Sequence, residues 1–175
     1  MRGDPPLPLT TAVALVDVDT ASRAAARRAA REGPIMQAVL RLFADGGGPV
    51  SVAAVAAAVG WDTAAAARAL RALSDDDLLV LRDEAVALAY PFSAAATGFV
   101  ARRPDGRERF ICCAIDALGL APMLGEPVAL TATCHHSGAP LRFAVTPDGP
   151  APDAGPLMVW VTRSGGDDAR ACTGL

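Results

Sequence analysis

The apolar positions in the first half of the chain follow the spacing of short helices. From Ile35 to Phe43 they recur at helical intervals, which predicts a helix that Pro34 starts and that ends at Gly46. Capping residues and alternating apolar residues predict the next elements: helices over 52–59 (cap Ser51) and 64–73 (cap Asp62 or Thr63), then strands over 78–82 and 85–90. This order of helices and hairpin is that of a winged helix-turn-helix.

In the second half of the chain, apolar and polar residues alternate in several segments, which favours strands on either side of one helix. The pattern predicts a helix over 113–124 and strands over 97–102, 109–112, 128–134, 140–146 and 156–162. The expected fold class is therefore α+β: an N-terminal winged helix-turn-helix-like helical module followed by a small antiparallel sheet with a helix packed on it. The expected parts are an N-terminal arm and helix (1–32), a winged-helix-like domain (33–90) and the α+β domain (91–175).

Composition adds constraints on packing and on partners. The chain has 175 residues, of which 52% are hydrophobic, mostly Ala and Val, and 5% are aromatic, so small side chains should let helices pack closely. The net charge of −3 gives no general attraction to nucleic acid or to an anionic membrane. No apolar run reaches the roughly 20 residues of a membrane span, and the N-terminus lacks a signal-peptide pattern. We therefore expect a cytoplasmic protein with its four cysteines reduced.

The predicted recognition helix of the N-terminal module is a poor DNA reader. Over 62–73 its only cationic residues are Arg68 and Arg71, and the acidic run Asp75–Asp77 follows. A major-groove reader needs a basic face for phosphates and polar side chains for base edges. We expect a structural module here, with a DNA-binding regulator as the competing interpretation.

Reactive side chains concentrate between Phe110 and Pro140, which hold three of the four cysteines and both histidines. Cys113 falls where a strand is predicted to run into a helix, a place where the helix dipole lowers a thiol pKa. Asp116 lies three residues on and shares a helix face with Cys113. The carboxylate can raise the thiol pKa by repulsion or relay the thiol proton; the competing interpretation is a buried cysteine and a first-turn aspartate, both structural.

The run Cys134-His135-His136 raises the question of a metal site. There is no C-x-x-C or H-x-x-x-H spacing, and adjacent histidines on a strand face opposite sides, which argues against zinc. No G-x-S-x-G elbow occurs, so a hydrolase triad is unsupported. We expect His135 and His136 to be loop or surface residues.

Three segments together resemble the core of the organomercurial (alkylmercury) lyases: Arg109–Asp116, Ala121–Gly125 and Val128–Pro140. In that family an active-site cysteine is followed by two apolar residues and an aspartate, and a later cysteine precedes Gly-Ala-Pro. Pro49–Ser51 and Gly60-Trp61 resemble the family's winged-helix-like domain, which is not known as a DNA reader. The resemblance spans about residues 34–162.

The resemblance implies an activity and residue roles. The family cleaves a carbon–mercury bond by protonolysis, giving a hydrocarbon and Hg(II). It implies that Cys113 is the first catalytic thiol and mercury ligand, that Asp116 is the proton-shuttling carboxylate, and that Cys134 is mainly structural. The substrate would be a small organometallic compound, and no organic cofactor would be needed. Low-molecular-weight thiols or a mercury-accepting protein would remove the Hg(II).

The chain departs from the family pattern at the second catalytic thiol. The candidate is Cys172, near the end of the sequence, and Cys112 is a neighbouring thiol where the family usually has an aromatic residue. Both are candidate mercury ligands beside Cys113. Two further interpretations stay open: a non-catalytic soft-metal (Hg or Cu) binder or sensor that uses Cys113, Cys134 and Cys172, and a lyase-derived enzyme with another substrate.

Overall fold

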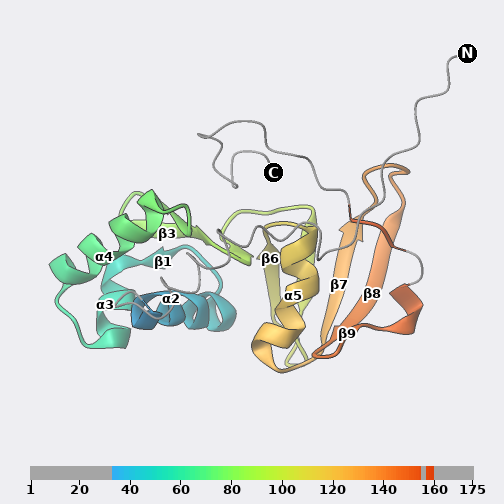
Figure 1. The fold of residues 1–175 in the computed structure, drawn as a ribbon, viewed down its shortest axis with the longest axis horizontal. Coiled ribbons are helices and arrows are strands. Elements are labelled where there is room, and N and C mark those ends of the chain that lie inside the picture. Colours follow the sequence, from blue (N-terminus) through green and yellow to red (C-terminus); the bar gives the residue numbers. More distant parts are fainter. Residues whose placement is uncertain (1–32, 155–156, 160–175) are drawn as a thin grey trace, which may run out of the picture. The chain divides into compact units, whose positions relative to one another are not determined.

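A computed structural model describes residues 33–154 and 157–159 of the chain (Figure 1). All of these described residues except Gly33 and Pro34 belong to one compact unit. The described helices are α2 (Gly33–Gly46), α3 (Val52–Val59), α4 (Thr63–Asp75), α5 (Ala114–Leu124) and the 3-10 turn η2 (Pro152–Ala154). The strands are β1 (Val50–Ser51), β2 (Leu79–Arg82), β3 (Ala85–Ala89), β4 (Phe92–Ser93), β5 (Phe99–Arg102), β6 (Glu108–Ile111), β7 (Val128–Thr133), β8 (Pro140–Thr146) and β9 (Gly149–Pro150).

Capping residues determine where the helices α3 and α4 of the N-terminal half begin and where α3 ends. The Ser51 hydroxyl accepts from the Ala54 N–H at 3.1 Å, and the Asp62 carboxylate accepts from the Ala65 N–H at 2.8 Å. Gly60 ends α3 with a φ of 69°, a left-handed conformation that glycine adopts without strain. The predicted order of helix, short helix, turn, helix and hairpin is found in the structure.

Within the described residues the strands form one nine-stranded sheet in which every pairing is antiparallel. Its order is β1-β3-β4-β6-β5-β7-β8-β9, with β2 also paired to β3. The two-residue strand β4 pairs with both β3 and β6, so it joins the hairpin of the first half to the strands of the second. The α+β fold class is thus confirmed, with a sheet larger than the small one expected.

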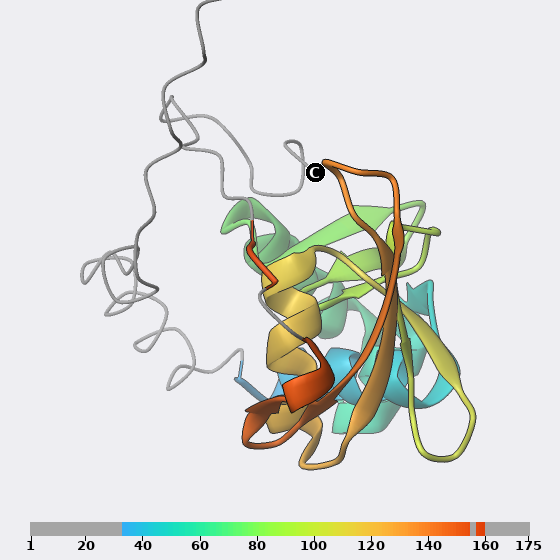
Figure 2. The same ribbon diagram turned by 90° about the vertical axis from the view of Figure 1, so that its right-hand side faces the viewer.

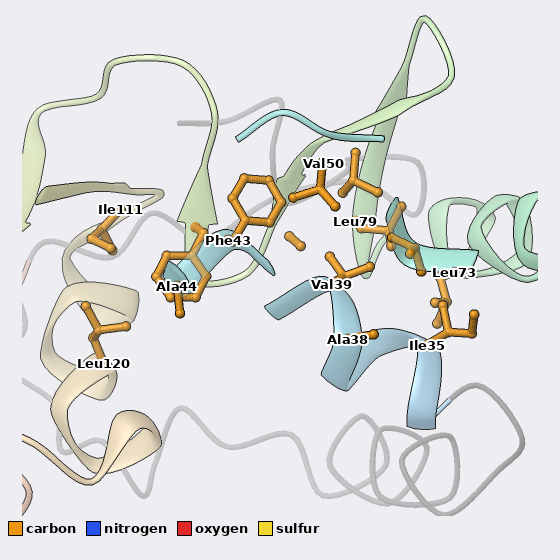
Figure 3. Packing of buried hydrophobic residues seen from close by; sticks show 14 of the residues in the cluster. Ile35, Ala38, Val39, Phe43, Ala44, Val50, Leu73, Leu79, Ile111 and Leu120 are labelled. Atoms are coloured by element: carbon orange, nitrogen blue, oxygen red, sulfur yellow. The ribbon is translucent and has the colours of Figure 1, made fainter. Parts of the chain in front are cut away.

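The core continues from the helices of the first half to α5. Phe43 of α2 stacks on Phe92 of β4 with ring centroids 6.0 Å apart. A Cβ at Gly48 would overlap the Phe43 ring, so this close approach requires glycine. Figure 3 shows Phe43 between Val50 on one side and Ile111 and Leu120 on the other. The packed small and medium side chains agree with the expectation from composition.

Arginines of the β5–β6 hairpin bind the C-terminal end of α2. Arg109 Nε donates to the Phe43 carbonyl at 2.8 Å, and its Nη2 donates to the Asp45 carbonyl at 2.6 Å. Arg103 Nη1 donates to the Ala44 carbonyl at 2.9 Å. These guanidinium groups satisfy carbonyls that the helix leaves open and complement its dipole. The hairpin that leads to Cys113 is thereby fixed to α2.

The predictions for the two ends of the chain have different outcomes. Leu157–Val159, the described part of the strand predicted over 156–162, form no strand, so that prediction is wrong for these residues. The arm and helix predicted over 1–32 and the rest of the chain after Val159 lie outside the described residues. In the part of the chain that the structure describes, no helix has the length and apolar content needed to cross a lipid bilayer.

Candidate functional site

The end of β6 and the start of α5 position Cys113. The Cys112 N–H donates to the Pro91 carbonyl at 2.9 Å, and the Thr97 hydroxyl donates to the Ile111 carbonyl at 2.7 Å. These bonds hold the backbone immediately before Cys113. Cys113 itself is extended (φ −149°, ψ 178°) and is the N-cap of α5. The predicted strand-to-helix junction is therefore found, and it is anchored from two directions.

Cys113 and Asp116 contact each other across the first turn of α5. The Cys113 Sγ donates to Asp116 Oδ2 at 3.1 Å, and the Asp116 N–H donates back to Sγ at 3.5 Å. Both side chains are partly buried. The pair predicted from the spacing of three residues is thus formed, with the thiol acting as the N-cap acceptor of the helix.

The pKa of Cys113 shifts opposite to the direction expected from the helix dipole. Burial raises it most, and the hydrogen bond and charge of Asp116 raise it further, against the lowering effect of the backbone N–H groups of Asp116 and Ile115. Burial also raises the pKa of Asp116, while the bond from the thiol opposes that rise. Burial of the Cys113 side chain, together with Asp116, outweighs the two backbone N–H groups, so at rest the thiol keeps its proton and donates it in the hydrogen bond to the carboxylate.

This geometry suits the exchange of a thiol proton for a soft metal ion. A soft ion that binds Sγ displaces the thiol proton, and thiolate is the preferred ligand of such ions. The Asp116 oxygen that already accepts the thiol hydrogen bond is the nearest acceptor for that proton. A raised carboxyl pKa makes Asp116 a better proton carrier than an ordinary aspartate.

Cys112 has a different environment from its neighbour. Its side chain is 6% exposed, and its Sγ donates to the Phe92 carbonyl at 3.3 Å. The two adjacent thiols thus have separate partners, Phe92 for Cys112 and Asp116 for Cys113. The role of Cys112 as a mercury ligand stays a prediction.

Cys134 lies in the turn between β7 and β8, with His135 and His136 exposed beside it. Hydrogen bonds from the Ser137 side chain and from the backbone of Ser137 and His136 lower the pKa of Cys134. Among residues 33–154 and 157–159, no three His, Cys, Asp or Glu side chains gather in a way that could hold a metal ion. The surface position of both histidines is as predicted.

One candidate site residue falls outside the described part of the chain, and one supporting residue was not found from the sequence. Cys172, the candidate second thiol, lies outside the described residues. Thr97 was missed as a support of the site because its partner Ile111 is 14 residues away in the sequence. The only local signal is a threonine at the start of a predicted strand, which says nothing about that partner.

Helix α4 contains residues 63–73 of the segment 62–73 that we predicted to be a poor reader of DNA. Arg68 and Arg71 of α4 are exposed, and so are Asp75 and Asp76 at its end. Between Asp62 and Glu84 the sequence has three arginines against six carboxylates. This balance gives a nucleic-acid backbone no net attraction.

Comparison with known families separates the two halves of the chain. Residues 92–174 match the family model described as alkylmercury lyase, and residues 37–83 match the IclR helix-turn-helix domain. The first match includes Cys113, Asp116, Cys134 and Cys172.

Curated relatives match a shorter stretch. An alkylmercury lyase of Streptomyces lividans is 41% identical over 44 residues, which are 25% of this chain and 20% of the relative. Alkylmercury lyases of Bacillus cereus and Clostridium butyricum are each 36% identical over 44 residues, again 25% of this chain and 20% of the relative. The matched segment thus spans a fifth of the length of these relatives.

A solved structure supports the fold. The mercury-bound form of MerB2 superposes with a TM-score of 0.60 and 23% identity, covering 69% of this chain and 58% of that one. Together the comparisons confirm the resemblance drawn from the sequence.

Proposed function

We propose that this chain, whose residues 92–174 match the alkylmercury lyase family model, cleaves the carbon–mercury bond of small organomercurials. Cys113 would bind the mercury atom as a thiolate, and Asp116 would carry the proton that ends on the carbon. The observation that carries the proposal is the 3.1 Å contact between Cys113 Sγ and Asp116 Oδ2, inside the segment that matches the family.

The first step of the proposed reaction is a ligand exchange. The organomercurial cation bonds to Cys113 Sγ, and the thiol proton passes along the existing hydrogen bond to Asp116 Oδ2. The carboxyl group becomes neutral, which its partly buried position favours because burial raises its pKa. The proton is then held one contact away from the sulfur that binds mercury.

The second step breaks the carbon–mercury bond. Thiolate ligands donate electron density to mercury, and the bond electrons go to the carbon as it takes the proton from Asp116. A new carbon–hydrogen bond replaces the carbon–mercury bond, so a hydrocarbon leaves and Hg(II) stays on the thiolate. No electrons are gained or lost, and Asp116 returns to its carboxylate form.

A second thiolate would complete the chelation of mercury and strengthen this donation. We assign that role to Cys172, with Cys112 as the alternative. External low-molecular-weight thiols, or a mercury-accepting protein, would then remove Hg(II) by ligand exchange. Comparison of Cys172→Ser with Cys112→Ser tests the assignment, because only the variant that lacks the second ligand should lose turnover.

The proposal is tested with phenylmercury. The reduced protein is incubated with phenylmercury and excess thiol, and benzene is measured by gas chromatography. We expect benzene from the wild type and from Cys134→Ser, whose thiol lies in the β7–β8 turn, and none from Cys113→Ser. Wild-type benzene no higher than in Cys113→Ser would overturn the lyase assignment, and tight Hg(II) binding in that case would point to the soft-metal binder instead.

A further inference from the structure

A pocket lies between α4 and the β2–β3 hairpin, in the N-terminal half of the chain. Its volume is about 270 Å³. The helix α4 and the strand β2 pack side by side in this half (Figures 1 and 2). All of the lining residues lie before residue 85, outside the stretch 92–174 that matches the lyase family. What this pocket binds is therefore a separate question from carbon–mercury cleavage.

One face of α4 supplies the first wall of the pocket. Thr63, Ala67 and Arg71 line it. They follow one another at intervals of four residues, which places them on the same side of the helix. Ala67 in the middle is partly buried, whereas the two polar residues are exposed. The wall thus has a small apolar centre between a hydroxyl group and a guanidinium group.

The end of the hairpin supplies the second wall. Its lining residues are Leu81, Arg82, Asp83 and Glu84. Asp83 and Glu84 have positive φ angles of 48° and 59°, as in the type I′ turns of two-residue hairpin loops. The Val52 N–H at the start of α3 donates to the Glu84 carbonyl at 3.2 Å. Backbone hydrogen bonds therefore fix this wall before any ligand arrives.

The lining combines apolar surface with charges of both signs. Its apolar residues Val52, Ala67 and Leu81 are buried or partly buried. Two arginines and two carboxylates line the same pocket, and all four are exposed. Within the described part of the chain, no ion pair joins these four side chains to one another. Their charges are thus free to pair with a ligand.

We propose that this pocket binds a free α-amino acid with an apolar side chain. Arg71 and Arg82 would attract its carboxylate. Asp83 and Glu84 would attract its ammonium group, and the apolar lining would cover its side chain. A simple anion would be repelled by the two carboxylates and a simple cation by the two arginines, so the balance of charge selects a zwitterion. Pockets for drug-sized ligands measure about 300–1,000 Å³, so a volume of about 270 Å³ suits a smaller molecule of this kind.

The probe is L-phenylalanine, titrated into the full chain and followed by saturation-transfer difference NMR. We expect saturable binding with a dissociation constant on the order of a millimolar, as ligands of this size give. Two analogues each lack one charge: 3-phenylpropionate has no ammonium group, and 2-phenylethylamine has no carboxylate. Each should bind about threefold more weakly or worse, because an exposed ion pair is lost. Absence of saturable binding of phenylalanine, or equally tight binding of either analogue, would overturn the proposal.

Three variants locate the binding to this pocket. Ala67→Leu places a larger side chain in the pocket and should abolish binding; leucine is a good helix former, and circular dichroism checks that α4 is retained. Arg71→Met keeps the length of an exposed side chain without its charge and should weaken binding about threefold. The matched control is Arg68→Met, which is exposed on the same helix but does not line the pocket, and it should bind like the wild type. Wild-type binding by Ala67→Leu, or an equal loss in Arg68→Met and Arg71→Met, would contradict the assignment.

Discussion

Replacing Asp116 by asparagine should change the chemical reactivity and the catalytic activity of Cys113 in opposite directions. Burial raises the pKa of Cys113 most, and the carboxylate of Asp116 raises it further. A thiolate and a carboxylate whose atoms lie 3.1 Å apart repel by about 1.3 kcal/mol even at the dielectric constant of water. Asparagine keeps the size of the side chain and removes this repulsion. It also removes the proton carrier that the proposed cleavage needs.

Relief of this repulsion should change the rate at which Cys113 is alkylated. Relief of about 1.3 kcal/mol corresponds to roughly tenfold more Cys113 thiolate at any pH below the thiol pKa. A thiolate of lower pKa is a weaker nucleophile, with a Brønsted slope of about 0.4–0.5, so the gain in alkylation rate falls to about threefold. The same variant should give no benzene from phenylmercury, because no carboxyl group can deliver the proton.

The assay is iodoacetamide labelling at pH 7, with tandem mass spectrometry assigning the label to each cysteine. Asp83→Asn is the matched control. Asp83 is exposed in the β2–β3 turn with a φ of 48°, a conformation that asparagine tolerates well. We expect wild-type labelling of Cys113 in this control. Slower labelling of Cys113 in Asp116→Asn than in the wild type would refute the assigned repulsion.

Three further predictions concern the pH dependence of stability, the reactivity of the Cys134 thiol and the contribution of Arg109 to stability. Burial raises the pKa of Asp116 above 3.8, so between 3.8 and the raised pKa the folded state holds a proton that the unfolded state releases. The free energy of unfolding of the wild type should therefore fall as the pH rises through this range. In urea titrations the free energy of unfolding of Asp116→Asn should fall less. Ser137→Ala removes the largest cause of the low Cys134 pKa, so alkylation of Cys134 should move to higher pH, and an unchanged profile would contradict that cause. Arg109→Met leaves carbonyls at the end of α2 without their donor and should cost about 1–3 kcal/mol in urea unfolding, whereas Arg102→Met, in an exposed ion pair, should cost less than about 1 kcal/mol.

The features that the sequence predicted correctly are local ones. The helix caps at Ser51 and Asp62 depend on a side chain and an N–H three residues away. The contact between Cys113 and Asp116 has the same spacing, so the pair could be predicted from the order of residues alone. Its protonation behaviour could not, because burial by the rest of the fold decides the direction of the Cys113 pKa.

The features that the sequence did not reveal depend on distant partners. Phe92 and Ser93 form a strand only because β3 and β6 flank them, and two residues carry no period of their own. Thr97 supports the site through Ile111, far along the chain. The strand predicted over 156–162 rests on apolar alternation alone, and Leu157–Val159 do not pair with a neighbouring strand in the structure.

In the proposed reaction Cys113 binds mercury and Asp116 supplies the proton, and a single-turnover experiment separates these roles. Wild type and Asp116→Asn are each loaded with one equivalent of phenylmercury, bound mercury is measured after gel filtration, and benzene release is then followed on adding thiol. We predict that both proteins retain phenylmercury and that only the wild type releases benzene. Benzene release from Asp116→Asn at the wild-type rate would contradict the role of Asp116 as the proton donor.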